Sequence, residues 1–309
     1  MKSPQTVEPQ RVPAPPLFFK ITFGRILTML PLVKRFVAGL TQQEALERTR
    51  RIQELGLLTS LDYLGEHLRD PEAAEAVTEE YVTLLENIAR DKDHPSYVSP
   101  KLTHLGLDIS DQTALANMRE ILAVAKKHEN FVRIDMEGSP YTERTLDIFR
   151  TLHAEFSDHV GIVIQAYLYR STHDIEELAA RGARVRLCKG AYKEPPNIAF
   201  RDKRGVDQNY DRLCEALMRE GTYPAIATHD PQRIRNAIAY ARKYGKSPRD
   251  FEFQMLLGIT NKMAVDLAKS GWRVRIYLPY GRQWLGYFYR RLRERKENFF
   301  FVLNNLFRG

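Results

Sequence analysis

The sequence predicts an α/β protein whose fold is a distorted (β/α)8 barrel. Eight short apolar runs alternate with helical stretches between Gly56 and Leu278, which is the pattern of a parallel sheet built from strand–helix units. The chain has 309 residues, enough for one barrel of about 250 residues with additional helices. No two of the seventeen glycines stand two positions apart, so the G-x-G-x-x-G turn of dinucleotide-binding sheets is missing. An open doubly wound sheet is therefore the second choice.

The eight predicted strands are short runs of apolar, often β-branched residues bounded by turn or helix signals. They cover residues 57–63, 96–102, 131–136, 161–168, 184–188, 225–228, 251–256 and 273–278. Because a helical stretch separates each strand from the next, we expect the strands to run parallel.

Helix starts are readable from capping residues. Thr41 and Glu44 form a capping box, which predicts a helix to about residue 54. Asp70 followed by Pro71 predicts a helix to about residue 90. The same kind of signal gives further helix starts at Ser110, Ser139, Ser171, Asp230 and Thr260.

The domain prediction is one barrel preceded by a shorter N-terminal element. Residues 1–55 form a proline-rich leader and helices packed on the barrel, and residues 56–309 form the barrel itself. The uncharged run 26–33 is too short to cross a membrane, which takes about 20 residues. That run and the apolar tail at 299–307 either pack on the barrel or lie on a membrane surface.

Composition excludes several classes of protein. The chain is 43% hydrophobic and 28% charged, which is typical of a globular protein rather than a disordered one. It contains two cysteines, Cys188 and Cys214, with no CxxC pair and no HExxH motif, so neither a disulfide scaffold nor a zinc site is predicted. The net charge of +8 suits nucleic acid, an anionic membrane or an anionic ligand.

The carboxyl ends of the predicted strands carry charged residues, and barrel enzymes place their chemistry there. Lys101 and Asp135 lie on neighbouring strands and could pair, either in acid–base or substrate-amine chemistry or as a structural salt bridge. On the fifth strand, alternation places Arg184, Arg186 and Cys188 on one face. Two cations on one strand face need buried partners.

A helix near the end of the chain carries the most specific pattern. Tyr287, Arg290, Arg291 and Glu294 are spaced to share one helical face. Two guanidinium groups beside an aromatic ring can clamp a carboxylate, with Glu294 aligning one of them. An exposed amphipathic face remains the alternative.

At this helix the sequence resembles the proline dehydrogenase family. The pattern Tyr280-Gly281-x-x-Trp284-x-x-Tyr287-x-x-Arg290-Arg291-x-x-Glu294 is similar to the family's C-terminal signature. Seven further motifs agree in order: Leu61-Asp62-Tyr63-Leu64-Gly65-Glu66, Lys101-Leu102-Thr103, Arg133-Ile134-Asp135, Gln165-Ala166-Tyr167, Arg186 to Tyr192, Thr228-His229 and Phe251 to Leu256. The resemblance spans residues 56–298 and is closest to the stand-alone bacterial form.

This resemblance implies a flavin enzyme. It implies a barrel with the last helix over the strand ends, and bound FAD. It further implies oxidation of L-proline to Δ1-pyrroline-5-carboxylate by hydride transfer from C5 to flavin N5, the first step of proline catabolism to glutamate. Electrons would pass to a membrane quinone, so the implied location is cytoplasmic and peripheral to the inner face of the cell membrane. The positive charge then fits an anionic membrane surface, nucleic acid becomes the least favoured partner, and an oligomer stays open.

The resemblance also implies roles for individual residues. Those expected to meet the substrate are Lys101, Asp135, Leu256, Tyr277, Tyr287, Arg290, Arg291 and Glu294, with Glu66 as a gate that pairs with an arginine when no substrate is bound. Those expected to bind FAD are Gln165, Arg186, Lys189, Ala191, Tyr192, Thr228 and His229. No metal is expected.

Two other functions stay open on the residues alone. One is a cofactor-free lyase or aldolase that uses Lys101 or Lys189 as a Schiff-base nucleophile. The other is a basic nucleic-acid-binding module, although the chain has no continuous basic cluster.

Overall fold

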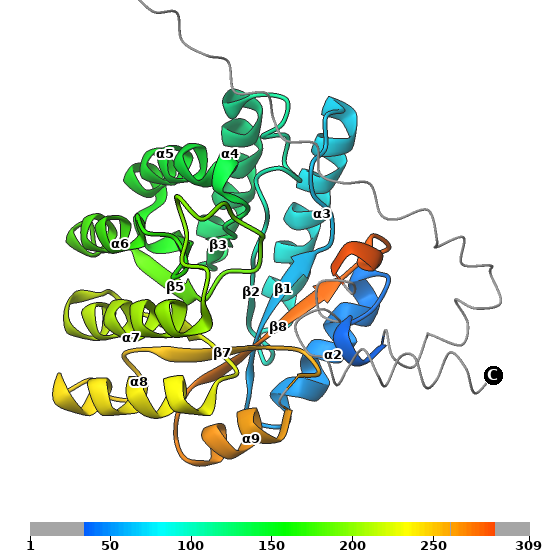
Figure 1. Cartoon of the computed structure of the whole chain (residues 1–309). Helices are drawn as coiled ribbons and strands as arrows, with labels where there is room; N and C mark the ends of the chain where they lie inside the picture. The colour runs from blue at the N-terminus through cyan, green and yellow to red at the C-terminus, as the bar shows by residue number, and fades with distance from the viewer. Residues whose placement is uncertain (1–33, 260, 288–309) are drawn as a thin grey trace, which may run out of the picture.

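The computed structural model describes residues 34–259 and 261–287, and it confirms the barrel (Figure 1). Eight parallel strands follow one another around the barrel in chain order, and β1 closes the sheet against β8. Helices lie around the outside of the sheet, as Figure 1 shows. The strands are β1 (Leu58–Tyr63), β2 (Ser96–Val98), β3 (Val132–Ile134), β4 (Val160–Gln165), β5 (Arg184–Cys188), β6 (Ala225–Ala227), β7 (Glu252–Leu256) and β8 (Val274–Tyr280).

The helices alternate with these strands. They are α2 (Gln42–Gln53), α3 (Pro71–Arg90), α4 (Asp111–Lys127), α5 (Ser139–Phe156), α6 (Ser171–Ala180), α7 (Lys203–Glu220), α8 (Pro231–Lys243) and α9 (Asn261–Lys269), with a short 3-10 turn, η1 (Ser157–His159), before β4. Among the residues that the structure describes, no helix has the length and apolar character that crossing a membrane requires.

Four predicted helix caps are confirmed. The side chains of Thr41, Asp70, Ser110 and Asp230 each accept a hydrogen bond from a backbone N–H in the first turn of the helix that follows. These bonds satisfy donors that have no partner within the helix, so α2, α3, α4 and α8 begin where the sequence predicts.

Three helix starts differ from the prediction. Ser139 is the first residue of α5 rather than its cap, because Gly138 holds the cap position. The Ser171 hydroxyl donates to the Gln165 carbonyl at 2.5 Å and does not cap α6. Helix α7 was not predicted; the Asp202 side chain caps it through the Gly205 N–H at 2.8 Å. The predicted start at Thr260 lies outside the described residues.

Strands β2, β3 and β4 are shorter than predicted. β4 ends at Gln165, where the Leu168 N–H turns back to the Gln165 carbonyl at 3.2 Å, and a proline ends β2. The Ser99 N–H still donates to the Leu61 carbonyl at 2.8 Å, but Pro100 has no N–H to continue the ladder. Residues 101–107 then turn away from the sheet. Lys101 therefore lies in a loop at the mouth of the barrel rather than within a strand.

The two sides of the barrel wall differ in chemistry. On β5, Val185 and Leu187 are fully buried among apolar residues beneath the helices. Between them, Arg186 points into the barrel, where it contacts Tyr97 of β2 and Asp135, which follows β3. On β5, therefore, the apolar side chains face the helices and a charged side chain faces the interior.

The described part of the N-terminal element packs on the barrel. Helix α2 contacts β1 and β8. The Ala38 N–H donates to the Pro279 carbonyl at 2.7 Å, and the Gly281 N–H donates to the Gly39 carbonyl at 2.9 Å. The apolar run 26–33 and the tail at 299–307 lie outside the described residues.

Candidate active site

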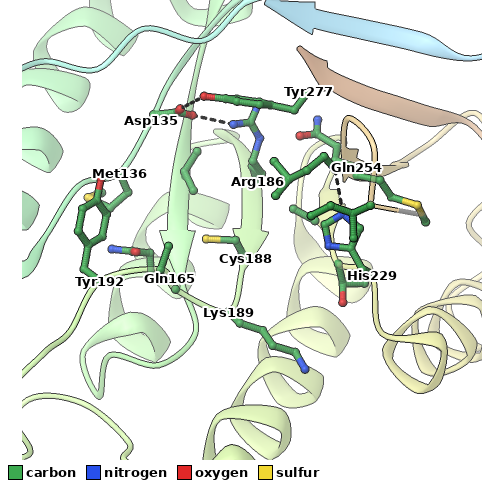
Figure 2. A pocket seen from close by; sticks show the side chains of 18 of the residues that line it. Asp135, Met136, Gln165, Arg186, Cys188, Lys189, Tyr192, His229, Gln254 and Tyr277 are labelled. Carbon is green, nitrogen blue, oxygen red and sulfur yellow. Dashed lines mark hydrogen bonds and ion pairs between the residues drawn. The ribbon is translucent and has the colours of Figure 1, made fainter. Parts of the chain in front are cut away.

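A cavity of about 600 Å³ opens at the carboxyl ends of the strands. Figure 2 shows side chains from β3 to β8 and their following loops pointing into it. Five of the predicted substrate residues line this cavity: Lys101, Asp135, Leu256, Tyr277 and Tyr287. All seven predicted cofactor residues line it as well: Gln165, Arg186, Lys189, Ala191, Tyr192, Thr228 and His229. One cavity thus collects residues that lie far apart in the sequence.

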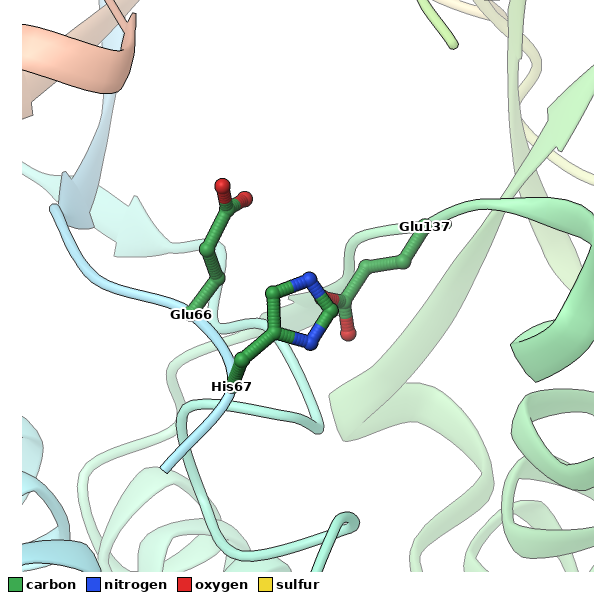
Figure 3. A group of neighbouring side chains, drawn as sticks. All are labelled: Glu66, His67 and Glu137. Carbon is green, nitrogen blue, oxygen red and sulfur yellow. The ribbon is translucent and has the colours of Figure 1, made fainter. Parts of the chain in front are cut away.

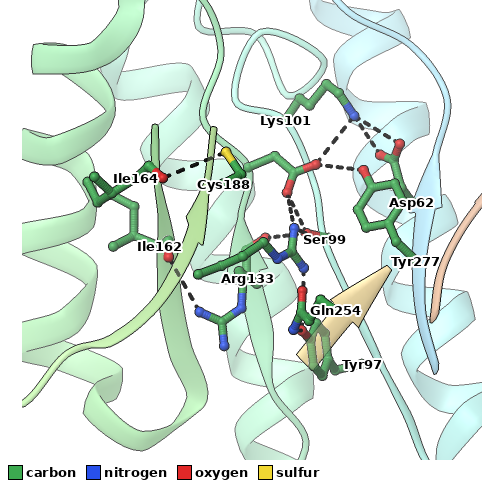
Figure 4. Close-up of polar contacts among 12 residues, drawn as sticks. Asp62, Tyr97, Ser99, Lys101, Arg133, Ile162, Ile164, Cys188, Gln254 and Tyr277 are labelled. Carbon is green, nitrogen blue, oxygen red and sulfur yellow. Dashed lines mark hydrogen bonds and ion pairs between the residues drawn. The ribbon is translucent and has the colours of Figure 1, made fainter. Parts of the chain in front are cut away.

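Four charged side chains form a row of alternating sign at the base of the cavity. Lys101 Nζ lies 2.9 Å from each carboxylate oxygen of Asp62 (Figure 4). It lies 3.6 Å from Asp135 Oδ2. On the far side of Asp135, Arg186 Nη1 donates to Oδ1 at 2.7 Å. The predicted Lys101–Asp135 pair is therefore present, but the closer partner of Lys101 is Asp62.

The Asp135 carboxylate is held on both oxygens. Oδ1 accepts from Arg186 and from the Ser99 hydroxyl, each at 2.7 Å. Oδ2 accepts from the Tyr277 hydroxyl at 2.6 Å. Charge-assisted hydrogen bonds of this kind are among the strongest in proteins, so Asp135 has a fixed position between β2, β5 and β8.

Electrostatics keep Lys101 charged. Burial acts to lower the pKa of Lys101, but attraction to Asp62 and Asp135 outweighs burial and holds the pKa above its ordinary value. Burial raises the pKa of Asp62, and Lys101 opposes that rise. A protonated lysine cannot attack a carbonyl, so this environment argues against Lys101 as a Schiff-base nucleophile.

A second polar layer lies deeper in the barrel. The Gln254 amide donates to the Tyr97 hydroxyl at 2.6 Å, and that hydroxyl also accepts from Arg186 Nη2 at 3.3 Å. Arg275 binds both oxygens of Glu252, at 2.8 and 2.9 Å, and its guanidinium lies 4.2 Å from the centre of the Tyr97 ring. Burial acts to raise the pKa of Glu252, but Arg275 outweighs it and the pKa falls to about 2. This layer supports Arg186 from below.

The opposite side of the cavity carries other predicted cofactor residues. The Gln165 amide donates to the Glu137 carbonyl at 2.9 Å. Lys189 Nζ lies 2.9 Å from Asp230 Oδ2 and also pairs with Asp207. His229 Nε2 accepts from the Leu256 N–H at 2.9 Å. These contacts fix an amide, a cation and an imidazole around one opening.

Glu66 is placed differently from the residues of the cavity wall. It lies beside His67 and Glu137, and the possible ligand atoms of the three fall within 4.8 Å of one another (Figure 3). The Glu137 carboxylate accepts from the Thr103 N–H at 3.0 Å, and His67 Nδ1 lies 3.0 Å from Asp108 Oδ2. These contacts account for the orientations of His67 and Glu137, and we assign no metal to the group. The predicted partners of Glu66, Arg290 and Arg291, lie outside the described residues, as does Glu294.

Sequence reasoning gave no role to four residues that complete this site. Asp62 and Gln254 line the cavity, and Ser99 and Tyr97 hold the side chains within it. Asp62 and Gln254 each lie in a strand segment that belongs to one of the family motifs described above. That position was a signal from which their place in the site could have been predicted. Ser99 and Tyr97 carry no such signal, because their partners are known only once the barrel closes.

Comparison with known proteins gives a consistent result. Residues 45–303 match the family model described as proline dehydrogenase. The chain is 42% identical over 273 residues to proline dehydrogenase 1 of Bacillus subtilis strain 168, covering 88% of this chain and 90% of the relative. It is 39% identical over 285 residues to the proline dehydrogenase of Deinococcus radiodurans, covering 91% and 92% respectively.

A solved structure agrees with these matches. The crystal structure of proline utilization A from Bdellovibrio bacteriovorus, inactivated by N-propargylglycine, superimposes with a TM-score of 0.81 at 26% sequence identity. The match covers 87% of this chain but 33% of that larger protein. The similarity therefore concerns the barrel part of the larger molecule.

Proposed function

The chain belongs to the proline dehydrogenase family, and from this premise we propose that it oxidises L-proline to Δ1-pyrroline-5-carboxylate with FAD in the barrel cavity. When bound, FAD would accept a hydride from C5 of proline at flavin N5. The observation that carries the proposal is the convergence of twelve predicted residues, five for substrate and seven for cofactor, on one cavity at the strand ends.

The residues present fit a flavin. Arg186 is only 5% exposed, and its Nε is buried with no hydrogen-bond partner among the described residues. A buried donor without a partner is costly, and the carbonyl or ring-nitrogen acceptors of a flavin would satisfy it. The cavity wall also carries apolar side chains that suit a flat ring: Met136, Val163, Ala227, Met255, Leu256 and Ile259.

We assign the cofactor residues by their chemistry and by the family motifs. Arg186 and Gln165 would meet the flavin ring, and Arg186 would stabilise the negative charge that the ring gains. The polar group at the opening would hold the ribityl, phosphate and adenosine parts: Lys189, Ala191, Tyr192, Thr228 and His229. Lys189 supplies a cation that can bind a phosphate group.

The other residues would orient proline. Lys101 and Asp135 would line the carboxylate and amine side of the substrate, and Leu256, Tyr277 and Tyr287 would wall its ring. Arg290 and Arg291, with Glu294 behind them, would clamp the carboxylate, and Glu66 would pair with one of these arginines in the empty site. Holding C5 in one position gives the alignment that a fast transfer step requires.

The substrate amine must lose its proton before C5 can release a hydride. Asp135 already accepts three hydrogen bonds, so it serves to position the amine rather than to remove its proton. We therefore expect the rate to rise with pH as the amine of bound proline deprotonates.

We place the enzyme in the cytoplasm, at the inner face of the cell membrane. A membrane quinone would accept the electrons, and the net charge of +8 supports attraction to an anionic lipid surface. Lys20, Arg25, Lys34 and Arg35 flank apolar runs, which supports the same surface contact.

The experiment is a cofactor and turnover assay on the purified chain. We expect a yellow protein that releases FAD on denaturation and that oxidises proline with an artificial electron acceptor. A protein without flavin absorbance, even after FAD is supplied, would refute the proposal. Borohydride trapping of a lysine–substrate adduct would instead support the cofactor-free lyase.

A further inference from the structure

We propose that Asp62 is a positioning residue for the substrate carboxylate, acting through Lys101. This inference rests on the proposed function and adds a residue that the family motif analysis left without a role. It starts from the two equal contacts of 2.9 Å between Lys101 Nζ and the Asp62 oxygens.

These contacts determine where the ammonium group points. An ammonium group has three N–H donors. Asp62 holds the group through both of its oxygens, and Asp135 Oδ2, at 3.6 Å, lies beyond hydrogen-bond distance. Because Lys101 also lines the cavity, a remaining donor can serve an anionic group there.

Asp62 is suited to hold Lys101 rather than to bind the ligand itself. It is 1% exposed and lies on β1, and both its oxygens are used by Lys101. Asp135, by contrast, is committed to Arg186, Ser99 and Tyr277. Without Asp62, Lys101 would turn to Asp135, the nearest remaining carboxylate, and away from the substrate.

Charge counting alone predicts a different effect of Asp62 on anion binding. Asp62, Lys101, Asp135 and Arg186 sum to zero, so the row attracts an anion only through the direction of its donors. Replacing Asp62 by asparagine makes the row net positive, which on charge alone would tighten anion binding. If Asp62 acts by positioning Lys101, the same substitution weakens anion binding instead. The measured affinity of the variant for an anion therefore distinguishes positioning from net charge.

The test is a double-mutant cycle with Asp62→Asn and Lys101→Met on the FAD-loaded protein. We expect Asp62→Asn to raise the KM for proline on the order of tenfold, to change kcat less than threefold and to leave the FAD content unchanged. In the Lys101→Met background, Asp62→Asn should change KM less than twofold, since a residue that acts only through a partner has no effect once that partner is removed. The double variant also removes both buried charges, so it guards against failure of a single variant to fold.

Cyclopentanecarboxylate, a ring acid without the amine, supplies a second readout. Its Kd, measured by calorimetry, should rise in parallel with KM in Asp62→Asn. Ser60→Ala is the matched control, because Ser60 lies on the same strand, is fully buried, and has no hydrogen-bond partner for its Oγ among the described residues. It should leave KM and Kd unchanged.

Unchanged or tighter binding in Asp62→Asn, or equal effects of this substitution in both backgrounds, would overturn the inference. These results differ from a failure of the proposed function. In that case the wild-type protein would not oxidise proline, whereas the Kd for the ring acid would still report whether Asp62 acts through Lys101.

Discussion

Tyr277→Phe tests the hydrogen bonding around Asp135. The substitution keeps the aromatic wall of the cavity and removes a single hydroxyl, which donates to Asp135 Oδ2 at 2.6 Å. A hydrogen bond to a charged group contributes about 1.5–3 kcal/mol. Because Asp135 keeps Arg186 and Ser99 on its other oxygen, we expect the lower end of that range. This corresponds to about a tenfold fall in kcat/KM for proline.

Stability should fall by a similar amount, which is about 3–6 °C in Tm for a domain of this size. Tyr280→Phe is the matched control. Tyr280 lies on the same strand, is fully buried, and its hydroxyl donates to Glu80 Oε1 at 2.8 Å, away from the cavity wall. It should lose stability without losing activity. The test is to measure steady-state kinetics and thermal unfolding of Tyr277→Phe and Tyr280→Phe. An equal loss of kcat/KM in both variants, or no loss in Tyr277→Phe, would refute the reasoning.

Three further predictions follow from the same network and from the arginine pair. Arg186→Lys keeps a charge but cannot bridge Asp135 and Tyr97 as the guanidinium does, so the flavin-to-protein ratio should fall at least tenfold at limiting FAD. The pKa of Glu252 is about 2 in the folded state, below its unfolded value of about 4.3, so its contribution to stability is complete above pH 4.3 and is lost as the pH falls toward 2. That contribution is about 3 kcal/mol, of which about 2 kcal/mol is lost between pH 6 and pH 3. Over this range, urea unfolding should show Glu252→Gln losing about 2 kcal/mol less stability than wild type. Arg290→Met or Arg291→Lys should raise the KM for proline at least tenfold while FAD stays bound.

Each of these has an opposite outcome that is easy to recognise. Wild-type FAD content in Arg186→Lys would remove Arg186 from the cofactor site. An identical acid sensitivity in Glu252→Gln would mean that the Arg275 pair does not stabilise the folded state. Unchanged proline kinetics in both arginine variants would exclude the carboxylate clamp.

The sequence was sufficient for the architecture because local signals agreed with it. All eight predicted strands occur. Four predicted capping residues, Thr41, Asp70, Ser110 and Asp230, accept the expected hydrogen bonds at the starts of their helices. Boundaries were less accurate where a backbone detail intervenes. Pro100 ends the β2 ladder, and helix α7 follows a cap at Asp202 that no capping box or N1 proline announces.

The site was only partly accessible from the sequence. Motifs identified the residues of the cavity wall, because strand ends and resemblance both point to Lys101 and Asp135. The order of their contacts could not be derived, since it depends on closure of the barrel, which brings Asp62 of β1 nearer to Lys101 than Asp135 is. The same holds for Tyr97, whose partners Gln254 and Glu252 lie across the barrel on β7.

The most direct test of the central claim is an anaerobic titration of the FAD-loaded protein with L-proline, followed by the flavin absorbance. We expect one equivalent of proline to bleach one equivalent of flavin, with Δ1-pyrroline-5-carboxylate as the product identified by mass spectrometry. A flavin spectrum that proline leaves unchanged would contradict the account.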